Sequence, residues 1–179
     1  MSVFMSREGG ISIFRVGIFM GIVGLLVIVG GFVLLEFERA ARRSPLNVDV
    51  YPGAMQIHQE DGSNSRVRGF QVAGSDDGTI GAVVGHYQAE LNSYYGNDPR
   101  DPGRELCDRN PDEGEFPGFE PGNGTIAFEF YCVFDDDSDL AGQRQTTIRI
   151  YPGNRDDTDT DGFNSTNSTI IEYTEFWVP

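Results

Sequence analysis

Residues 157–162, with the sequence DTDTDG, come closest in residue type and spacing to a known site chemistry. Alternate carboxylates can converge on a calcium ion, and glycine permits the sharp turn of a calcium-binding loop. An EF-hand would need a glutamate at the twelfth loop position, but Ser168 stands there, and no flanking helices are expected. Two interpretations stay open: a looser calcium site formed by Asp157, Asp159 and Asp161, and a solvated acidic loop.

Catalytic motifs are missing from the sequence. It contains no Gly-x-Ser-x-Gly elbow, no P-loop, no Gly-x-Gly-x-x-Gly and no His-Glu-x-x-His. The two histidines, His58 and His86, stand at unrelated positions, and an acidic composition produces carboxylate pairs by chance. We therefore expect no catalytic residues, no enzymatic activity and no cofactor besides calcium.

Cys107 and Cys132 are the only cysteines, and they form no Cys-x-x-Cys or haem-attachment motif. In an exported domain they would form one disulfide that ties an irregular segment to a strand. In a cytosolic domain they would be two free thiols.

The whole chain is organised around residues 16–35, twenty consecutive apolar or glycine residues without a charge. A helix of this length spans about 30 Å, the thickness of the hydrocarbon layer of a bilayer. The pattern predicts an N-terminal tail over residues 1–15, a single transmembrane helix over 16–37 and a juxtamembrane linker over 38–45. Residues 46–179 then form one tethered domain.

The glycines of this apolar run fall on one side of the helix. Gly17, Gly21, Gly24 and Gly31 lie within one narrow arc at 100° per residue, and the first two form a Gly-x-x-x-Gly pair. Small residues on one face let a second helix approach closely in lipid, so this face is a candidate packing surface. The alternative is that glycine is simply common in membrane helices.

Charge divides sharply between the two parts of the chain. Residues 1–45 carry a net charge of +2 and residues 46–179 a net charge of −17, without any lysine. Nucleic acid and anionic lipid would repel the acidic domain, whereas a basic protein or a divalent cation would be attracted. A solubilising surface explains the acidity equally well.

The orientation of the chain in the membrane follows from two opposing signals. The arginines that flank the apolar run slightly favour a cytoplasmic C-terminus, but long domains translocate largely regardless of such counts. The cysteine pair and the loops rich in glycine, proline and asparagine are typical of an exported domain. We predict a single-pass protein of the cell membrane with a cytoplasmic N-terminus and an extracytoplasmic C-terminal domain.

Hydrophobic periodicity predicts an α+β domain in which one helix packs on a mainly antiparallel sheet, in the order ββαβββ. The expected helix covers residues 79–95 and carries an apolar stripe at helical spacing. Residues 96–124 lack periodicity, and residues 135–139 are expected to form an acidic turn. The expected strands cover residues 48–54, 66–73, 125–134, 143–151 and 169–178.

Two short motifs carry a resemblance over residues 46–95. Residues 51–54 have the sequence Tyr-Pro-Gly-Ala, and residues 87–91 have the sequence Tyr-Gln-Ala-Glu-Leu. The segment resembles small membrane-anchored exported bacterial domains that open with such a strand end. The overall plan is similar to single-pass accessory subunits of photosynthetic and respiratory membrane complexes.

The second resemblance implies a non-catalytic accessory subunit of a larger membrane complex, with electron transfer or photosynthesis as the implied process. Its partners would be transmembrane helices of that complex. The acidic charge adds a basic soluble protein as a partner and excludes nucleic acid. The alternative is a free-standing, membrane-anchored surface binding module, stabilised by calcium.

Overall fold

The computed structural model describes residues 13–96, 106–138, 142–153 and 167–178. The chain divides into two compact units, Met1–Ala41 and Arg42–Pro179. The acidic stretch with the proposed calcium ligands Asp157, Asp159 and Asp161 lies outside the described residues.

The first unit contains the helix α1, Ile13–Ala41, which is longer than the predicted span and includes the first residues of the predicted linker. Its segment Val16–Ala41 is long and apolar enough to cross a membrane. The apolar side chains along this segment are exposed, as a lipid-facing helix requires. A Cβ atom built at Gly17, Gly21, Gly24 or Gly31 would meet no described atom within 4 Å.

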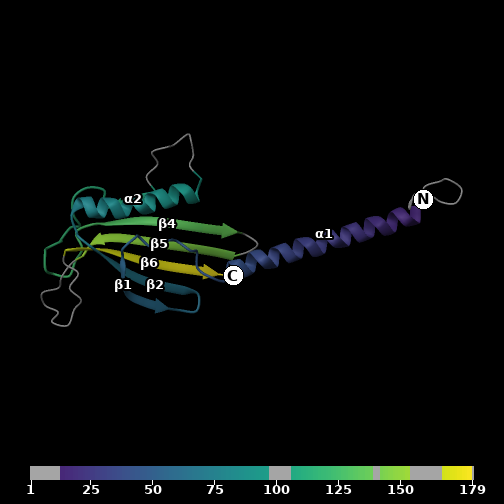
Figure 1. Cartoon of the computed structure of the whole chain (residues 1–179), viewed down its shortest axis with the longest axis horizontal. Coiled ribbons are helices and arrows are strands. Elements are labelled where there is room, and N and C mark those ends of the chain that lie inside the picture. Colours follow the sequence, from purple (N-terminus) through teal and green to yellow (C-terminus); the bar gives the residue numbers. More distant parts are fainter. Residues whose placement is uncertain (1–12, 97–105, 139–141, 154–166, 179) are drawn as a thin grey trace. The chain divides into compact units, whose positions relative to one another are not determined.

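The second unit is an antiparallel sheet of six strands with one helix on it, which confirms the predicted α+β class. The strand order is β1-β2-β6-β5-β4-β3. The helix α2, Asp77–Tyr94, runs along one face of this sheet (Figure 1). The strands are β1 (Met55–Asp61), β2 (Ser65–Ala73), β3 (Cys107–Asn110), β4 (Glu129–Ser138), β5 (Gly142–Pro152) and β6 (Ser168–Val178).

Helix α2 begins and packs as its sequence pattern predicts. The side chain of Asp76 caps its N-terminus by accepting hydrogen bonds from the backbone N–H groups of Gly78 and Thr79. The buried residues of α2 follow the 3.6-residue period of a helix with one face on a core. These residues are Ile80, Val83, Tyr87 and Leu91.

The predicted strand over residues 48–54 is wrong, because the strand that pairs with β2 is β1, which follows this segment. Residues 48–54 instead lie on the sheet beside α2 and bury Val48 in the core. Two tyrosine hydroxyls, and not a strand, bind the backbone of this segment. The backbone N–H of Tyr51 donates to Tyr87 Oη at 3.1 Å, and Tyr173 Oη donates to the carbonyl of Asp49 at 2.8 Å. The core layer therefore consists of a helix and the irregular segment over residues 48–54, which ends in a turn over residues 51–54.

Strand β3 lies in a region that the sequence analysis expected to lack regular structure. It pairs with β4, and Cys107 stands opposite Cys132 in the register of the two strands. These cysteines form the predicted disulfide, which closes a loop over a sequence separation of 25. Loop closure of this length stabilises a fold by about 3.5 kcal/mol in the chain-entropy model. Four residues are too few for a visible alternation, so only the pairing reveals this strand.

The predicted acidic turn over residues 135–139 is also wrong over its described part, because β4 continues to Ser138. Asp136 stands opposite Arg144 of β5 and forms an ion pair with it. Arg42, the first residue of this unit, forms a second ion pair with Asp136 at 2.7 Å. The two arginines remove the charge repulsion that would otherwise oppose a strand here.

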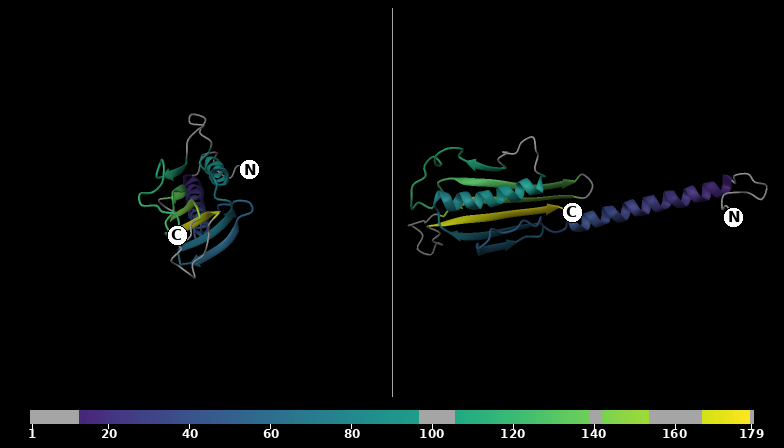
Figure 2. Two further views of the ribbon diagram at one scale, coloured as in Figure 1. Left: turned by 90° about the vertical axis from the view of Figure 1, so that its left-hand side faces the viewer. Right: turned by 45° about the horizontal axis from the view of Figure 1, so that its top comes forward.

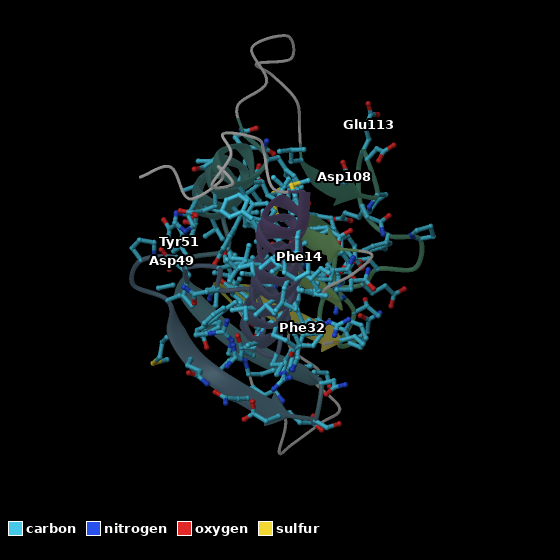
Figure 3. All side chains as sticks on the ribbon, turned by 90° about the vertical axis from the view of Figure 1, so that its right-hand side faces the viewer. Phe14, Phe32, Asp49, Tyr51, Asp108 and Glu113 are labelled. Atoms are coloured by element: carbon cyan, nitrogen blue, oxygen red, sulfur yellow. A yellow bond between two sulfur atoms is a disulfide. The ribbon has the colours of Figure 1, made fainter. Side chains whose placement is uncertain are left out.

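The two sides of the domain are built from different segments. Asp49 and Tyr51, in the irregular segment, lie on one side of the domain. Asp108 on β3 and Glu113 just after β3 lie on the opposite side (Figure 3). The core lies between the sheet on one side and α2 with the irregular segment on the other. On the sheet face that borders the core, Ile148, Ile150 and Ile171 are fully buried.

Candidate binding site

The second face of the sheet carries a cluster of charged and aromatic side chains. Helix α2 and residues 48–54 cover the first face, and the second face is the one opposite α2 (Figure 2). Because strand side chains alternate, the residues next to the buried isoleucines of β5 point to this second face. Tyr131, Arg149 and Glu172 stand in one row across β4, β5 and β6.

Arg149 is the centre of the cluster. Its Nε and Nη2 atoms donate to Glu129 Oε2 at 3.0 and 2.7 Å, and its Nη1 atom donates to Glu172 Oε1 at 3.2 Å. The guanidinium carbon also lies 5.8 Å from the ring centroid of Tyr131 and 5.5 Å from that of Tyr151. Two carboxylates and two aromatic rings therefore hold this one side chain in place.

The two tyrosine hydroxyls complete the network. Tyr131 Oη donates to Glu129 Oε1 at 2.7 Å, and Tyr151 Oη donates to Glu172 Oε2 at 3.4 Å. The hydrogen bond to Glu129, together with burial, raises the pKa of Tyr131. Burial and the charge of Glu172 raise the pKa of Tyr151 to about 12. Both hydroxyls are therefore protonated at neutral pH and act as hydrogen-bond donors.

Arg149 stays charged within this network. Burial lowers its pKa, but the hydrogen bond to Glu129 and the charges of Glu172 and Glu129 outweigh burial and raise the pKa above its ordinary value. One cation and two carboxylates give this cluster a formal charge of −1. The positive charge of Arg149 is thus compensated before any ligand arrives.

A pocket of about 560 Å³ opens beside this cluster, between β5 and the loop over residues 116–126. This size lies within the range of about 300–1,000 Å³ that is typical of small-molecule sites. The pocket has apolar walls and one polar side. Its lining includes Phe116, Phe119, Ile126, Thr125, Arg149 and Tyr151.

The loop that forms the outer wall of the pocket is held by its own hydrogen bonds. The N–H of Phe116 donates to the carbonyl of Ala127 at 2.7 Å, and the N–H of Phe119 donates to the carbonyl of Phe116 at 3.0 Å. Gly118, between the two phenylalanines, has a φ of 84°, which only glycine adopts without strain. Both phenylalanine rings are half-buried, so the loop presents aromatic surface to the pocket.

A second pocket of about 320 Å³ lies between α2 and β4 and is lined by Ile80, Phe128 and Arg109. The Arg109 guanidinium lies 4.4 Å from the Phe128 ring centroid, and its Nη2 atom donates to the carbonyl of Gly114 at 2.7 Å. Arg109 therefore supports the chain that follows β3, and the larger pocket is the better candidate site.

The structure separates the residues that the sequence analysis singled out. The glycines lie on α1, the cysteines join β3 to β4, and His58 is exposed on β1. His86 is half-buried between the rings of Tyr51 and Tyr87, and no described residue bonds its Nε2 atom. Among the described residues, no group of three or more metal-binding side chains is placed to hold a metal ion.

The sequence analysis missed the Arg149 cluster. Its sequence signal is the pair of short phrases Glu129-Phe130-Tyr131 and Arg149-Ile150-Tyr151, in which charged and aromatic residues occupy the non-core positions of two strands. That signal becomes meaningful only when the strands are known to be neighbours.

No family model, no curated protein and no solved structure matches this chain. The function is therefore argued from the geometry of the chain itself.

Proposed function

We propose that this protein is a membrane-anchored, non-catalytic binding module. The observation that carries the proposal is the pocket beside Arg149, which combines half-buried aromatic walls with a preformed polar cluster on the sheet face opposite α2. Helix α1, long and apolar enough to cross a membrane, would be the anchor.

Two properties of the pocket favour binding over catalysis. The raised pKa values of Tyr131 and Tyr151 keep both hydroxyls protonated at neutral pH, so neither supplies a nucleophile or a base. Glu129 and Glu172 are both hydrogen-bonded to Arg149 and to a tyrosine. Both carboxylates are thus engaged in hydrogen bonds within the cluster and serve to hold its side chains in place.

In this proposal the C-terminal domain lies outside the cytoplasm and the N-terminus lies in the cytoplasm. Helix α1 would cross the cell membrane once. The disulfide supports this orientation, because disulfides persist in oxidising compartments. The net charge of −17 on residues 46–179 supports a basic soluble protein as a further partner of the domain.

Photo-crosslinking in native membranes tests the binding module. The variant Phe119→p-benzoylphenylalanine places a crosslinker at the pocket, and Phe176→p-benzoylphenylalanine, at a 42 % exposed residue of the same sheet face outside the pocket, is the matched control. We expect an adduct at position 119 that the control does not give. Equal labelling at both positions, or none, would contradict the proposal.

A second candidate function is that of an accessory subunit of a larger membrane complex. The grouping of Gly17, Gly21, Gly24 and Gly31 on one face of α1 favours it, because small residues let a partner helix approach closely. Electron transfer or photosynthesis remains the process that the overall plan implies.

Extraction in mild detergent followed by sizing tests the subunit hypothesis. The protein should migrate with a large assembly, and the double variant Gly21→Leu/Gly24→Leu should release it. Gly30→Leu is the matched control, because Gly30 lies on the opposite side of the helix at 100° per residue. Unchanged co-migration of the double variant would rule out packing through the glycine face.

Calcium binding by Asp157, Asp159 and Asp161 stays a prediction. Melting curves with and without a chelator check it, and an unchanged melting temperature would remove it.

A further inference from the structure

We propose that the pocket beside Arg149 binds a neutral saccharide. This inference rests on the proposed function and names the ligand class of the same site. It follows from three properties of the pocket: its charge balance, its aromatic walls and its hydrogen-bonding groups.

Charge balance argues against strongly charged ligands. An anion would meet Arg149, but Glu129 and Glu172 already compensate that charge and would repel the anion. A cation would meet the guanidinium of Arg149, which is the charged group that lines the pocket. A neutral ligand avoids both penalties.

The aromatic walls match the apolar faces of sugar rings. Phe116, Phe119 and Tyr151 line the pocket and are half-buried, so their rings keep part of their surface accessible. The C–H groups on one face of a pyranose pack against such rings and remove apolar surface from water. The loop hydrogen bonds described above hold the two phenylalanines before the ligand binds, which limits the entropy cost of binding.

The polar groups of the pocket match hydroxyl pairs. An arginine has five N–H donors, and the hydrogen bonds of Arg149 to Glu129 and Glu172 engage three nitrogen atoms once each. The remaining N–H groups of Arg149 can donate to vicinal hydroxyls. The hydroxyl oxygens of Tyr151 and Thr125, whose O–H groups already donate to Glu172 and Asn123, can accept from such hydroxyls. A purely apolar ligand would use none of these groups, at a cost in affinity.

Calorimetric titration of the full chain in phospholipid nanodiscs tests the inference, because nanodiscs avoid detergents with sugar head groups. The probes are maltohexaose, cellohexaose and chitohexaose. We expect at least one of them to bind with a Kd between about 10 µM and 1 mM. Polygalacturonate, an anionic saccharide, should bind more weakly than the neutral probe.

Two variants assign the binding to the pocket. Phe119→Ala should weaken the affinity by about tenfold or more, whereas Phe176→Ala, on the same face outside the pocket, should leave it unchanged. Melting curves of both variants confirm that each is folded. Equal loss in both variants would assign the binding elsewhere and overturn the inference.

The remaining outcomes separate this inference from the proposed function. No binding of any probe up to about 10 mM overturns the saccharide inference. If Phe119→p-benzoylphenylalanine then crosslinks to a protein, the binding module stands and its ligand is a peptide. If it crosslinks to nothing, both proposals fail.

Discussion

Glu175 is a fully buried carboxylate that two arginines share. Arg66 Nε lies 2.6 Å from Glu175 Oε2 and Arg68 Nη2 lies 3.0 Å from Glu175 Oε1, and each arginine makes two hydrogen bonds to the carboxylate. Both arginine side chains keep some exposure to water, whereas that of Glu175 is 0 % exposed. Removal of both arginines would therefore leave a buried carboxylate without a compensating charge, which would destabilise the fold.

This asymmetry predicts a non-additive pair of variants. Arg66→Gln should lower the free energy of unfolding by only about 1 kcal/mol, because Arg68 still pairs with Glu175 through two hydrogen bonds. Arg66→Gln/Arg68→Gln should lower it by about 3–5 kcal/mol, because a buried charge is left without a partner. Urea unfolding measures both, and simple additivity would contradict the sharing of the carboxylate.

Asp136 predicts a dependence of stability on acidic pH. Burial would raise its pKa, but hydrogen bonds and charges of Arg144 and Arg42 outweigh burial and lower it. A carboxyl group with a lowered pKa stabilises the fold above its unfolded value of about 3.9 and loses this contribution as the pH falls through the folded value. The stability difference between wild type and Asp136→Asn should therefore shrink as the pH falls from about 6 to about 3. A constant difference, in urea unfolding at each pH, would contradict this account.

At the scale of elements, α2 contains glycines that no described part of the chain explains. A Cβ atom built at Gly81 or Gly85 would meet no described atom within 4 Å, and both residues are exposed. Glycine lowers the stability of a helix interior by about 1 kcal/mol relative to alanine.

Gly81→Ala and Gly85→Ala should therefore each raise the free energy of unfolding, by up to about 1 kcal/mol. Gly78→Ala is the matched control in the same helix, because its Cβ would lie 3.0 Å from Asp76 Oδ1, the capping atom. Urea unfolding of the purified protein measures all three variants. A loss of stability at position 81 or 85 would contradict this account.

At the scale of the whole molecule, the disulfide indicates on which side of the membrane the proposed C-terminal domain lies. A domain outside the cytoplasm should carry Cys107 and Cys132 fully oxidised in intact cells. Rapid acid quenching followed by alkylation with a mass-tagged maleimide measures this: we expect no alkylation before reduction and two tags afterwards. Two tags without reductant would place the domain in a reducing compartment and reverse the proposed orientation.

Several elements of this protein could be predicted from the sequence because their signals are local. The apolar run of α1 is one continuous segment, and the apolar stripe of α2 shows a helical period within a few turns. Strands β2, β5 and β6 are at least nine residues long, and the sequence placed them nearly correctly. The class of the domain follows from one such helix and several such strands.

The errors occurred where long-range pairing outweighs local pattern. Residues 48–54 alternate like a strand, but hydroxyls of Tyr87 and Tyr173 bind their backbone and no strand does. Strand β3 is too short to show a period, and β4 continues through an acidic stretch because Arg42 and Arg144 neutralise Asp136. The contacts of Tyr87, Tyr173 and Arg42 join residues far apart in the chain.

The candidate site depends on the same kind of information. The sequence by itself determined the long apolar helix α1, the helix α2, the cysteine pair and the acidity of the domain, because each is a property of one segment or of composition. Only the tertiary structure brought Glu129, Arg149 and Glu172 together from three strands and set the loop of Phe116 and Phe119 beside them. The physical reason is that strand order and register depend on which segments exchange backbone hydrogen bonds, and no local pattern encodes that choice.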